Sequence, residues 1–190
     1  STAATGTITV ANAPVAVASS AVVYVGAVRV SIPISTTMTN ANIATALAAA
    51  INAAPDIQVT AAAVAAVVTV TANNKGTLGN TIRIETRLIA DDGPTADTLF
   101  TIVQPSGGAG DPTITAALAN TGDLQFDWIV MPYSTGSFMT EIEAFLDDRW
   151  SPLKQIYGHA ISAMTGSAGT VLTATTAPAR NSWHSSMLAM

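Results

Sequence analysis

The stretch Phe126–Ala163 constrains the fold of this chain most, because its pattern predicts a strand, a helix and a second strand in succession. Phe126–Met131 is continuously apolar, which is typical of a strand buried on both faces of a sheet. Pro152 ends the following helix, and Gln155–Ala163 reads as the next strand. Buried strands separated by helices predict a mainly parallel α/β sheet in this half of the chain.

The predicted helix that ends at Trp150 is amphipathic, and Ser134 or Ser137 can cap its first turn. Its apolar residues fall on one face of the helix: Phe138, Ile142, Phe145 and Leu146. Its acidic residues fall mostly elsewhere: Glu141, Glu143, Asp147 and Asp148. We therefore expect a face of carboxylates in water and an apolar face against the sheet.

The rest of the second half also alternates strands and helices. Leu99–Val103 and Trp183–Met190 are predicted strands, and Thr113–Leu118 and Ser167–Thr175 are predicted helices. Asp111-Pro112 precedes the first of these helices, with Asp as the expected cap and Pro at the first helical position.

The first half is predicted to be β-rich with one helix, Asn40–Ala54, which Thr39 or Asn40 can cap. The predicted strands are Gly6–Ala13, Ala21–Ile34, Ile57–Ala62, Val67–Thr71 and Thr81–Ile89, the third and fourth forming a hairpin. Asp91-Asp92-Gly93-Pro94 favours an exposed turn and marks the expected boundary. The predicted fold class is thus mixed, with a β-rich domain over residues 1–92 and an incomplete α/β domain over residues 93–190.

A low content of charge predicts that this chain is a subunit of an assembly. Only 10% of the 190 residues are charged, against about a quarter in an ordinary soluble domain. Low charge favours association, because little electrostatic repulsion opposes packing one copy against another. The net charge of −5 and seven scattered Lys and Arg residues exclude a basic stripe for direct nucleic-acid binding.

Other classes of function are also disfavoured by the sequence. The chain has no cysteine, so thiolate metal sites and thiol catalysis are excluded. Its longest apolar runs, such as Ala61–Val68, are too short to span a bilayer, so we expect a soluble protein without direct membrane insertion.

The loop Gly107–Pro112 lies between a strand and a helix, where phosphate and dinucleotide sites occur. As a GxGxxG pattern it has Gly108 and Gly110 but Thr113 in the third position, and no GK[ST] lysine follows. Asp111 at the helix start would also repel a phosphate. The expected role of these glycines is to form tight turns.

Asp127, His159 and Ser182 or Ser185 follow the order found in one type of serine hydrolase, but neither serine lies in a GxSxG elbow. The predicted role of His159 is a single hydrogen bond in a core or an interface. The helical acids, together with Asp91 and Asp92, lack the spaced D-x-D-x-DG pattern of a calcium loop. We therefore predict no catalytic, cofactor-binding or metal-binding residues.

The aromatic residues lack interleaved basic residues, so base stacking is not expected. Most of them are predicted to form core or subunit contacts: Trp128, Tyr133, Trp150, Tyr157 and Trp183.

Several segments resemble the contractile tail sheath proteins of myoviruses, especially the Mu-like sheath group. In the second half these are Gly107–Pro112 (GGAGDP), Phe126–Ser134 (FDWIVMPYS), Asp147–Ala163 (DDRWSPLKQIYGHAISA) and Ala179–His184 (ARNSWH). In the first half they are Gly6–Val10 (GTITV), Ile43–Asn52 (IATALAAAIN) and Val67–Ile84 (VVTVTANNKGTLGNTIRI). The segments also follow the order and spacing of that group.

The resemblance implies a structural protein of the phage tail, made in the host cytoplasm, with no enzymatic activity and no cofactor. Subunits of that family stack as six-fold rings around the tail tube. When the baseplate triggers them, they contract and drive the tube through the host envelope. Residues 6–89 would then be an outward-facing domain inserted into a conserved core, to which residues 98–190 would belong. The family joins neighbouring subunits by strand exchange through terminal arms, and neither arm is identifiable in this sequence.

Two other interpretations remain open at this stage. One is an enzyme that binds a nucleotide at Gly107–Pro112. The other is a secreted adhesin or surface-layer module, which the Thr, Ala and Val strands of the first half would suit.

Overall fold

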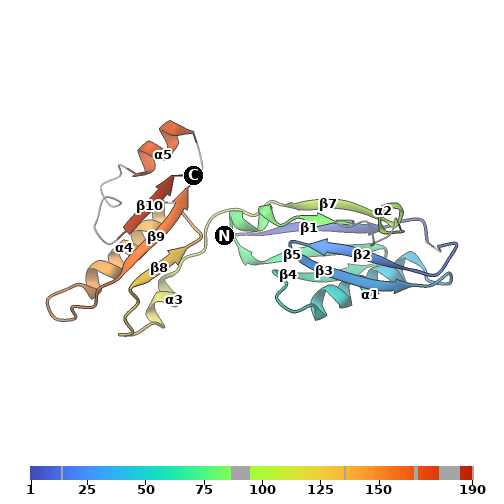
Figure 1. Ribbon diagram of the computed structural model, residues 1–190, viewed down its shortest axis with the longest axis horizontal. Coiled ribbons are helices and arrows are strands. Elements are labelled where there is room, and N and C mark those ends of the chain that lie inside the picture. The colour runs from blue at the N-terminus through green and yellow to red at the C-terminus, as the bar shows by residue number, and fades with distance from the viewer. Residues whose placement is uncertain (14, 87–94, 135, 165–166, 176–184, 190) are drawn as a thin grey trace. The chain divides into compact units, whose positions relative to one another are not determined.

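The computed structural model describes residues 1–13, 15–86, 95–134, 136–164, 167–175 and 185–189 (Figure 1). The chain forms two compact units, Ser1–Gly110 and Asp111–Met190. Antiparallel sheets build the first unit and a parallel sheet with helices builds the second, so the mixed fold class predicted from the sequence is confirmed.

A four-stranded antiparallel sheet forms the larger layer of the first unit. Its order is β4 (Val59–Val64), β5 (Val67–Lys75), β1 (Ala3–Val10) and β7 (Phe100–Ser106). β4 and β5 form the predicted hairpin. β1 lies in the interior of the sheet and pairs with β5 on one side and with β7 on the other.

A second sheet in this unit has the order β3 (Val28–Ile34), β2 (Ser19–Val25) and β6 (Ile84–Glu85). The prediction of one long strand over 21–34 was wrong, because the chain reverses at Gly26 and Ala27 to form an antiparallel hairpin. Gly26 has φ +61°, a conformation that costs glycine little and other residues more. The predicted strand 81–89 is restricted to Ile84–Glu85 among the described residues, and positions 87–89 lie outside them.

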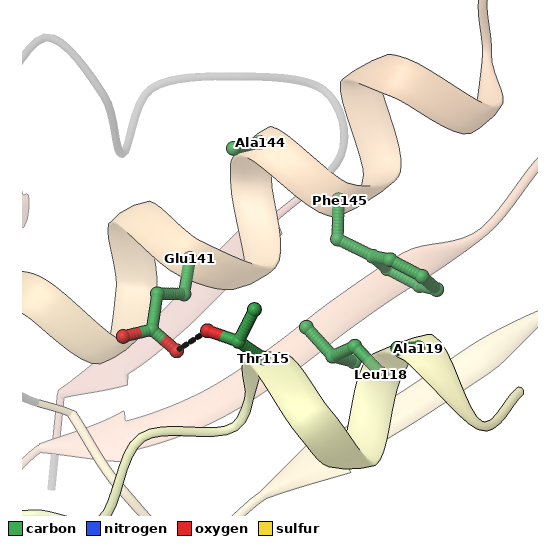
Figure 2. Close-up of a pocket in the computed structure, with 6 residues that line it drawn as sticks. All are labelled: Thr115, Leu118, Ala119, Glu141, Ala144 and Phe145. Atoms are coloured by element: carbon green, nitrogen blue, oxygen red, sulfur yellow. Dashed lines mark hydrogen bonds between the residues drawn. The ribbon is translucent and has the colours of Figure 1, made fainter.

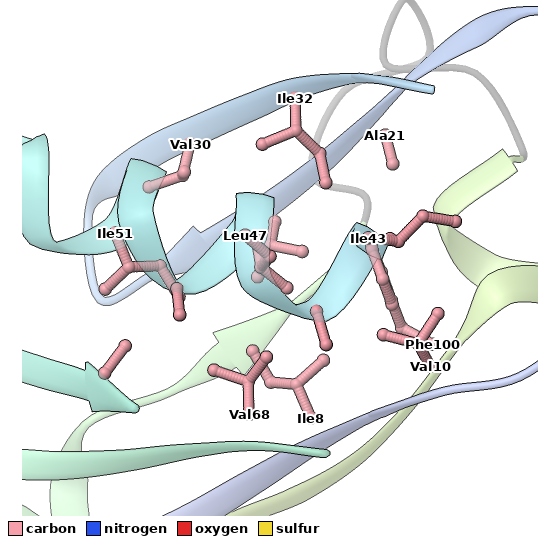
Figure 3. Packing of buried hydrophobic residues seen from close by; sticks show 14 of the residues in the cluster. Ile8, Val10, Ala21, Val30, Ile32, Ile43, Leu47, Ile51, Val68 and Phe100 are labelled. Atoms are coloured by element: carbon pink, nitrogen blue, oxygen red, sulfur yellow. The ribbon is translucent and has the colours of Figure 1, made fainter. Parts of the chain in front are cut away.

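The helix α1 (Asn40–Ala53) forms the centre of the core of the first unit. Its predicted cap is confirmed, since the side chain of Thr39 accepts a hydrogen bond from the backbone N–H of Asn42. Figure 3 shows Leu47 between strand β3 on one side and the larger sheet, with Ile8 and Val68, on the other. The spacing Ile43, Leu47, Ile51 therefore places three fully buried side chains on one helical face.

Short elements connect the two sheets of this unit. These are η1 (Thr77–Thr81) and α2 (Thr95–Leu99). The side chain of Gln104 on β7 accepts a hydrogen bond from the N–H of Ile84 and donates one to its C=O, at 2.9 and 2.7 Å. This amide thus links the edge of the larger sheet to β6.

The expected boundary at residues 92 and 93 falls within 87–94, outside the described residues. The division into two compact units lies at Gly110 and Asp111. The strand β7 belongs to the first unit because it pairs with β1 along its length. The assignment of the two regions as inserted domain and core remains a prediction.

The second unit contains the parallel sheet predicted from Phe126–Ala163. Its order is β10 (Ser185–Ala189), β9 (His159–Met164) and β8 (Trp128–Met131). The helices are α3 (Thr115–Ala119), α4 (Gly136–Arg149) and α5 (Ala168–Thr175). The core of this unit lies between α4 and the sheet, and its buried residues are Met131, Phe138, Met139, Ile142, Leu146 and Ala160. Of the helices within the described ranges, none combines the length and apolar character needed to span a bilayer.

Candidate interaction surface

One face of the parallel sheet is packed under α4 and the other face is exposed. Met131 is buried, as are Ala160 and Ser162 on β9, and the hydroxyl of Ser162 lies 3.4 Å from the sulfur of Met139 on α4. The alternate side chains of β8 point the other way, and Trp128 is 66% exposed and Val130 79% exposed. The prediction that this strand is buried on both faces was therefore wrong for the chain as described.

The exposed side chains of this sheet lie on one face. The strand order β8, β9, β10 follows the chain, and α4 packs against the buried side chains of the opposite face. On the other face Trp128 lies opposite His159 and Val130 lies opposite Ile161 in the parallel register. The rings of Trp128 and His159 meet edge to face, with centroids 5.4 Å apart. We call these four residues the bare sheet face.

A second apolar area lies where α4 leads into β9. Leu153 is 97% exposed, and the partly exposed rings of Trp150 and Tyr157 meet edge to face at 6.1 Å. Most of the exposed aromatic side chains among the described residues therefore lie in the second unit, in this area and on the bare sheet face. Large exposed apolar areas of this kind mark contact surfaces.

The larger sheet of the first unit has an outer face of a different composition. Most residues that alternate with its buried positions are uncharged, and the charged exception is Lys75 at the end of β5. The uncharged positions are Thr5, Thr7, Thr9, Thr60, Ala62, Val64, Val67, Thr69, Thr71, Thr101, Val103 and Ser106. Threonine and valine suit a pleated, half-exposed sheet surface. The absence of charge from these positions is consistent with the expectation of a weakly charged surface.

A groove of about 390 Å³ lies between α3 and α4 (Figure 2). Phe145 of α4 points toward Leu118 and Ala119 of α3, Ala144 also lines the groove, and Thr115 and Glu141 lie at one end. A carboxylate oxygen of Glu141 accepts hydrogen bonds from the backbone N–H of Ile114, at 2.9 Å, and from the hydroxyl of Thr115, at 3.3 Å. The groove is otherwise apolar.

These contacts correct the predicted cap of α3. The helix begins at Thr115 with Ile114 as the N-cap, so Asp111-Pro112 precedes it by several residues. The carboxylate that satisfies its first turn comes from Glu141, 27 positions along the chain, which sequence spacing cannot reveal. The prediction of a solvated acidic face on α4 was also wrong in part, since Glu143 is only 8% exposed.

The glycine loop is held in a structural role. The side chain of Asn80 accepts a hydrogen bond from the N–H of Gly108 at 2.8 Å and donates one to its C=O at 2.9 Å. A Cβ on Gly108 would lie 2.4 Å from the carbonyl oxygen of Gly76. The backbone N–H that a phosphate would use is therefore already bonded, and Gly108 is required for close packing.

The residues considered for a hydrolase triad make other contacts. The backbone N–H of His159 donates to the carbonyl oxygen of Asp127 at 3.0 Å, and the carboxylate of Asp127 accepts a hydrogen bond from Gln125. Ser185 lies on β10 opposite Ala160, and Ser182 is outside the described residues.

Carboxylates considered as metal ligands do not converge within the described ranges, where no group of three His, Asp or Glu side chains has metal-binding geometry. Asp91 and Asp92 lie outside those ranges. The ring of Tyr133 packs against that of Phe138 beside the core, tilted by 54°. Trp183 is also outside the described residues.

Sequence analysis missed the residue that holds the other end of the α3 region. Arg149, at the end of α4, is only 5% exposed and donates hydrogen bonds to the carbonyl oxygens of Gly122 and Leu124. Its guanidinium also lies 4.9 Å from the centre of the Phe145 ring. The only sequence signal is a basic residue in the last helical turn, which is common and usually exposed.

Comparison with known proteins gives one informative match. Over 134 residues, 70% of this chain, the sequence is 29% identical to the Mu-like prophage FluMu tail sheath protein of Haemophilus influenzae. This chain is similar to a tail sheath protein. The matched part is 27% of that relative, so the chain spans about a quarter of its length. The similarity confirms the resemblance noted in the sequence. No family model matches the chain.

Proposed function

We propose that this chain is part of a structural subunit of a contractile phage tail sheath. The observation that carries the proposal is the similarity to the Haemophilus tail sheath protein across 70% of the chain. Copies would assemble with one another as six-fold rings around a tail tube. On a signal from the baseplate they would shorten and drive the tube through the host envelope. The protein would act in the virion tail, without direct contact with nucleic acid and without insertion into a membrane.

The surface chemistry supports an assembly role. The bare sheet face exposes Trp128 and Val130 on a parallel sheet, a kind of sheet that proteins normally cover on both faces. With only 10% charged residues in the chain, little electrostatic repulsion opposes close packing of many copies. Both features suit a subunit that is buried among neighbours.

The two compact units would have different roles in the sheath. We propose that the unit Ser1–Gly110, with its complete core, is the outward-facing domain, and that the unit Asp111–Met190 belongs to the sheath core. In this proposal the core needs further polypeptide to cover the bare sheet face. Contraction requires two packings of the same subunits, and the work would come from the free-energy difference between them, without a nucleotide or other cofactor.

The alternatives receive less support. A nucleotide-binding enzyme would need free backbone N–H groups at Gly107–Pro112, and Asn80 occupies the N–H of Gly108. A secreted adhesin would suit the Thr and Val face of the larger sheet. It would not account for the similarity to a sheath protein across both halves of the sequence. We therefore propose a non-enzymatic role.

Electron microscopy tests this proposal directly. The complete protein encoded by the gene is expressed with and without its tail tube protein and is imaged in negative stain. Hollow tubes or stacked six-fold rings are the expected result. Dispersed particles in the presence of the tube protein would contradict the proposal, and binding of ATP or NAD in calorimetry would favour the enzyme instead.

A further inference from the structure

Two side chains of α4 hold one exposed segment at both of its ends. Glu141 binds the start of α3, through the N–H of Ile114 and the hydroxyl of Thr115. Arg149 binds the carbonyl oxygens of Gly122 and Leu124. We call residues 113–124 the strap. The two side chains are eight positions apart, about 12 Å along the helix, so they span the length of α3.

The strap has little else to hold it. All twelve of its residues are described and none of them is buried. Ile114 and Leu118 are half-buried and pack against the edge of the α4 core, while Leu124 is 66% exposed. A helix of five residues is also unstable on its own, because nucleation costs more than so few hydrogen bonds return.

The face of α4 that packs on the sheet is held much more firmly. Met139 and Ile142 are fully buried against the sheet, and Phe138 and Leu146 are nearly so. Segments with few buried apolar contacts open at a lower free energy than the core around them. The helix can therefore keep its place on the sheet while the strap separates from its flank.

We infer that the strap is a conformational device, which opens from α4 as a unit while the core between α4 and the sheet stays folded. Opening breaks the bonds to Glu141 and Arg149 and separates Leu118 from Phe145. Gly122, at φ +54° with open space around its Cα, provides a point where the backbone can turn. The open state uncovers the flank of α4 that carries Phe145. The inference does not depend on the proposed function, since it concerns the second unit alone.

Native-state hydrogen exchange on the 190-residue chain tests the inference. The reporter amides in the strap are Leu118, Thr121 and Gly122, whose hydrogen bonds are internal to the strap. The reporters outside it are Trp150, bonded to Leu146, and His159, bonded to Asp127. In the unmodified chain the strap amides should exchange together, and faster than the two outside reporters.

Glu141→Ala should accelerate exchange of the strap amides about tenfold, because a hydrogen bond to a charged group is lost. Glu141→Gln should have a smaller effect, since its amide oxygen can still accept from Ile114. Arg149→Met should accelerate the same amides through the other end. Asp148→Ala is the matched control: this exposed acid on the same helix pairs with Lys154, at 2.5 Å, and its loss should leave the strap unchanged.

Two results would overturn the inference. If Glu141→Ala leaves the strap amides unchanged, the carboxylate does not hold the strap closed. If the variants accelerate Trp150 and His159 as much as the strap amides, the strap opens only when the whole unit unfolds. The milder Glu141→Gln variant keeps the test valid should Arg149→Met fail to fold.

Discussion

The two units bury their apolar side chains in different ways. In the first unit α1 lies between two sheets, so Ile43, Leu47 and Ile51 are enclosed on every side. In the second unit α4 covers one face of a sheet whose other face exposes Trp128 and Val130. The first arrangement buries its central helix on both sides. The second leaves large apolar side chains on a sheet face that is open to contact.

The largest effect on stability is expected in the core of the first unit. Leu47→Ala should lower the free energy of unfolding of the first unit by about 3 kcal/mol, because it leaves a cavity at a fully buried position. Urea unfolding followed by circular dichroism measures the change. Leu153→Ala in the second unit makes the same substitution at a 97% exposed position and should change stability by less than about 0.5 kcal/mol. Similar losses at both sites would refute the comparison.

A second test concerns close packing inside the larger sheet. A Cβ on Gly6 would lie 2.7 Å from the carbonyl oxygen of Val103 and 2.8 Å from the nitrogen of Pro105. Gly6→Ala should therefore destabilise the first unit by about 2 kcal/mol, as overpacking does elsewhere. Gly169→Ala on α5 is the control, because its Cβ would meet open space, and it should be neutral or stabilising. Thermal unfolding of both variants gives the answer.

A third test concerns the edge of β4. The side chain of Asn52 on α1 accepts from the N–H of Ala61 and donates to its C=O, both at 2.8 Å. Asn52→Ala should cost about 1–2 kcal/mol, because both backbone groups lose a part-buried partner. The same substitution at the exposed Asn74 should have little effect. If chemical denaturation shows the same small loss of unfolding free energy in both variants, the hydrogen bonds of Asn52 to β4 add no stability.

The smallest effect on stability is expected at the bare sheet face. Trp128→Thr should change the free energy of unfolding by less than about 0.5 kcal/mol, because the ring is 66% exposed. The same variant should weaken concentration-dependent association in analytical ultracentrifugation. Val17→Thr is a control at a 74% exposed apolar position of the first unit. Loss of stability without loss of association would mean that Trp128 supports its own domain and not a contact.

Local patterns predicted the elements whose stabilising partners are near in sequence. The spacing of Ile43, Leu47 and Ile51 and the cap at Thr39 predicted α1, because periodicity and capping act within one helix. The continuous apolar run before Met131 predicted a strand of a parallel sheet. It could not reveal whether both faces of the sheet are covered, since cover depends on crossovers and on segments elsewhere.

Contacts between distant residues account for what sequence reasoning missed. Glu141 holds α3, Asn80 holds Gly108, and Arg149 holds Gly122, each across more than 25 positions. Polar side chains at such separations carry no periodic signal. The hairpin at Gly26 was missed although the sequence carries a signal for it, since the alternation changes phase from Val25 to Val28 across Gly26-Ala27.

The interior position of β1 in the larger sheet has a consequence for biosynthesis. Thr5 of β1 pairs with Ser106 of β7, so β1 is synthesised about 100 residues before this partner strand. At a translation rate of roughly 5–20 residues per second, this interval is on the order of 5–20 seconds. During that time β1 can pair with β5, but its other edge has no partner strand. Where many copies are made at once, the β7 strand of another chain can pair with this open edge. The β4–β5 hairpin forms locally and gives β1 a partner on one side only, before β7 is made. Slow synthesis or high expression should therefore favour exchange of β7 between chains.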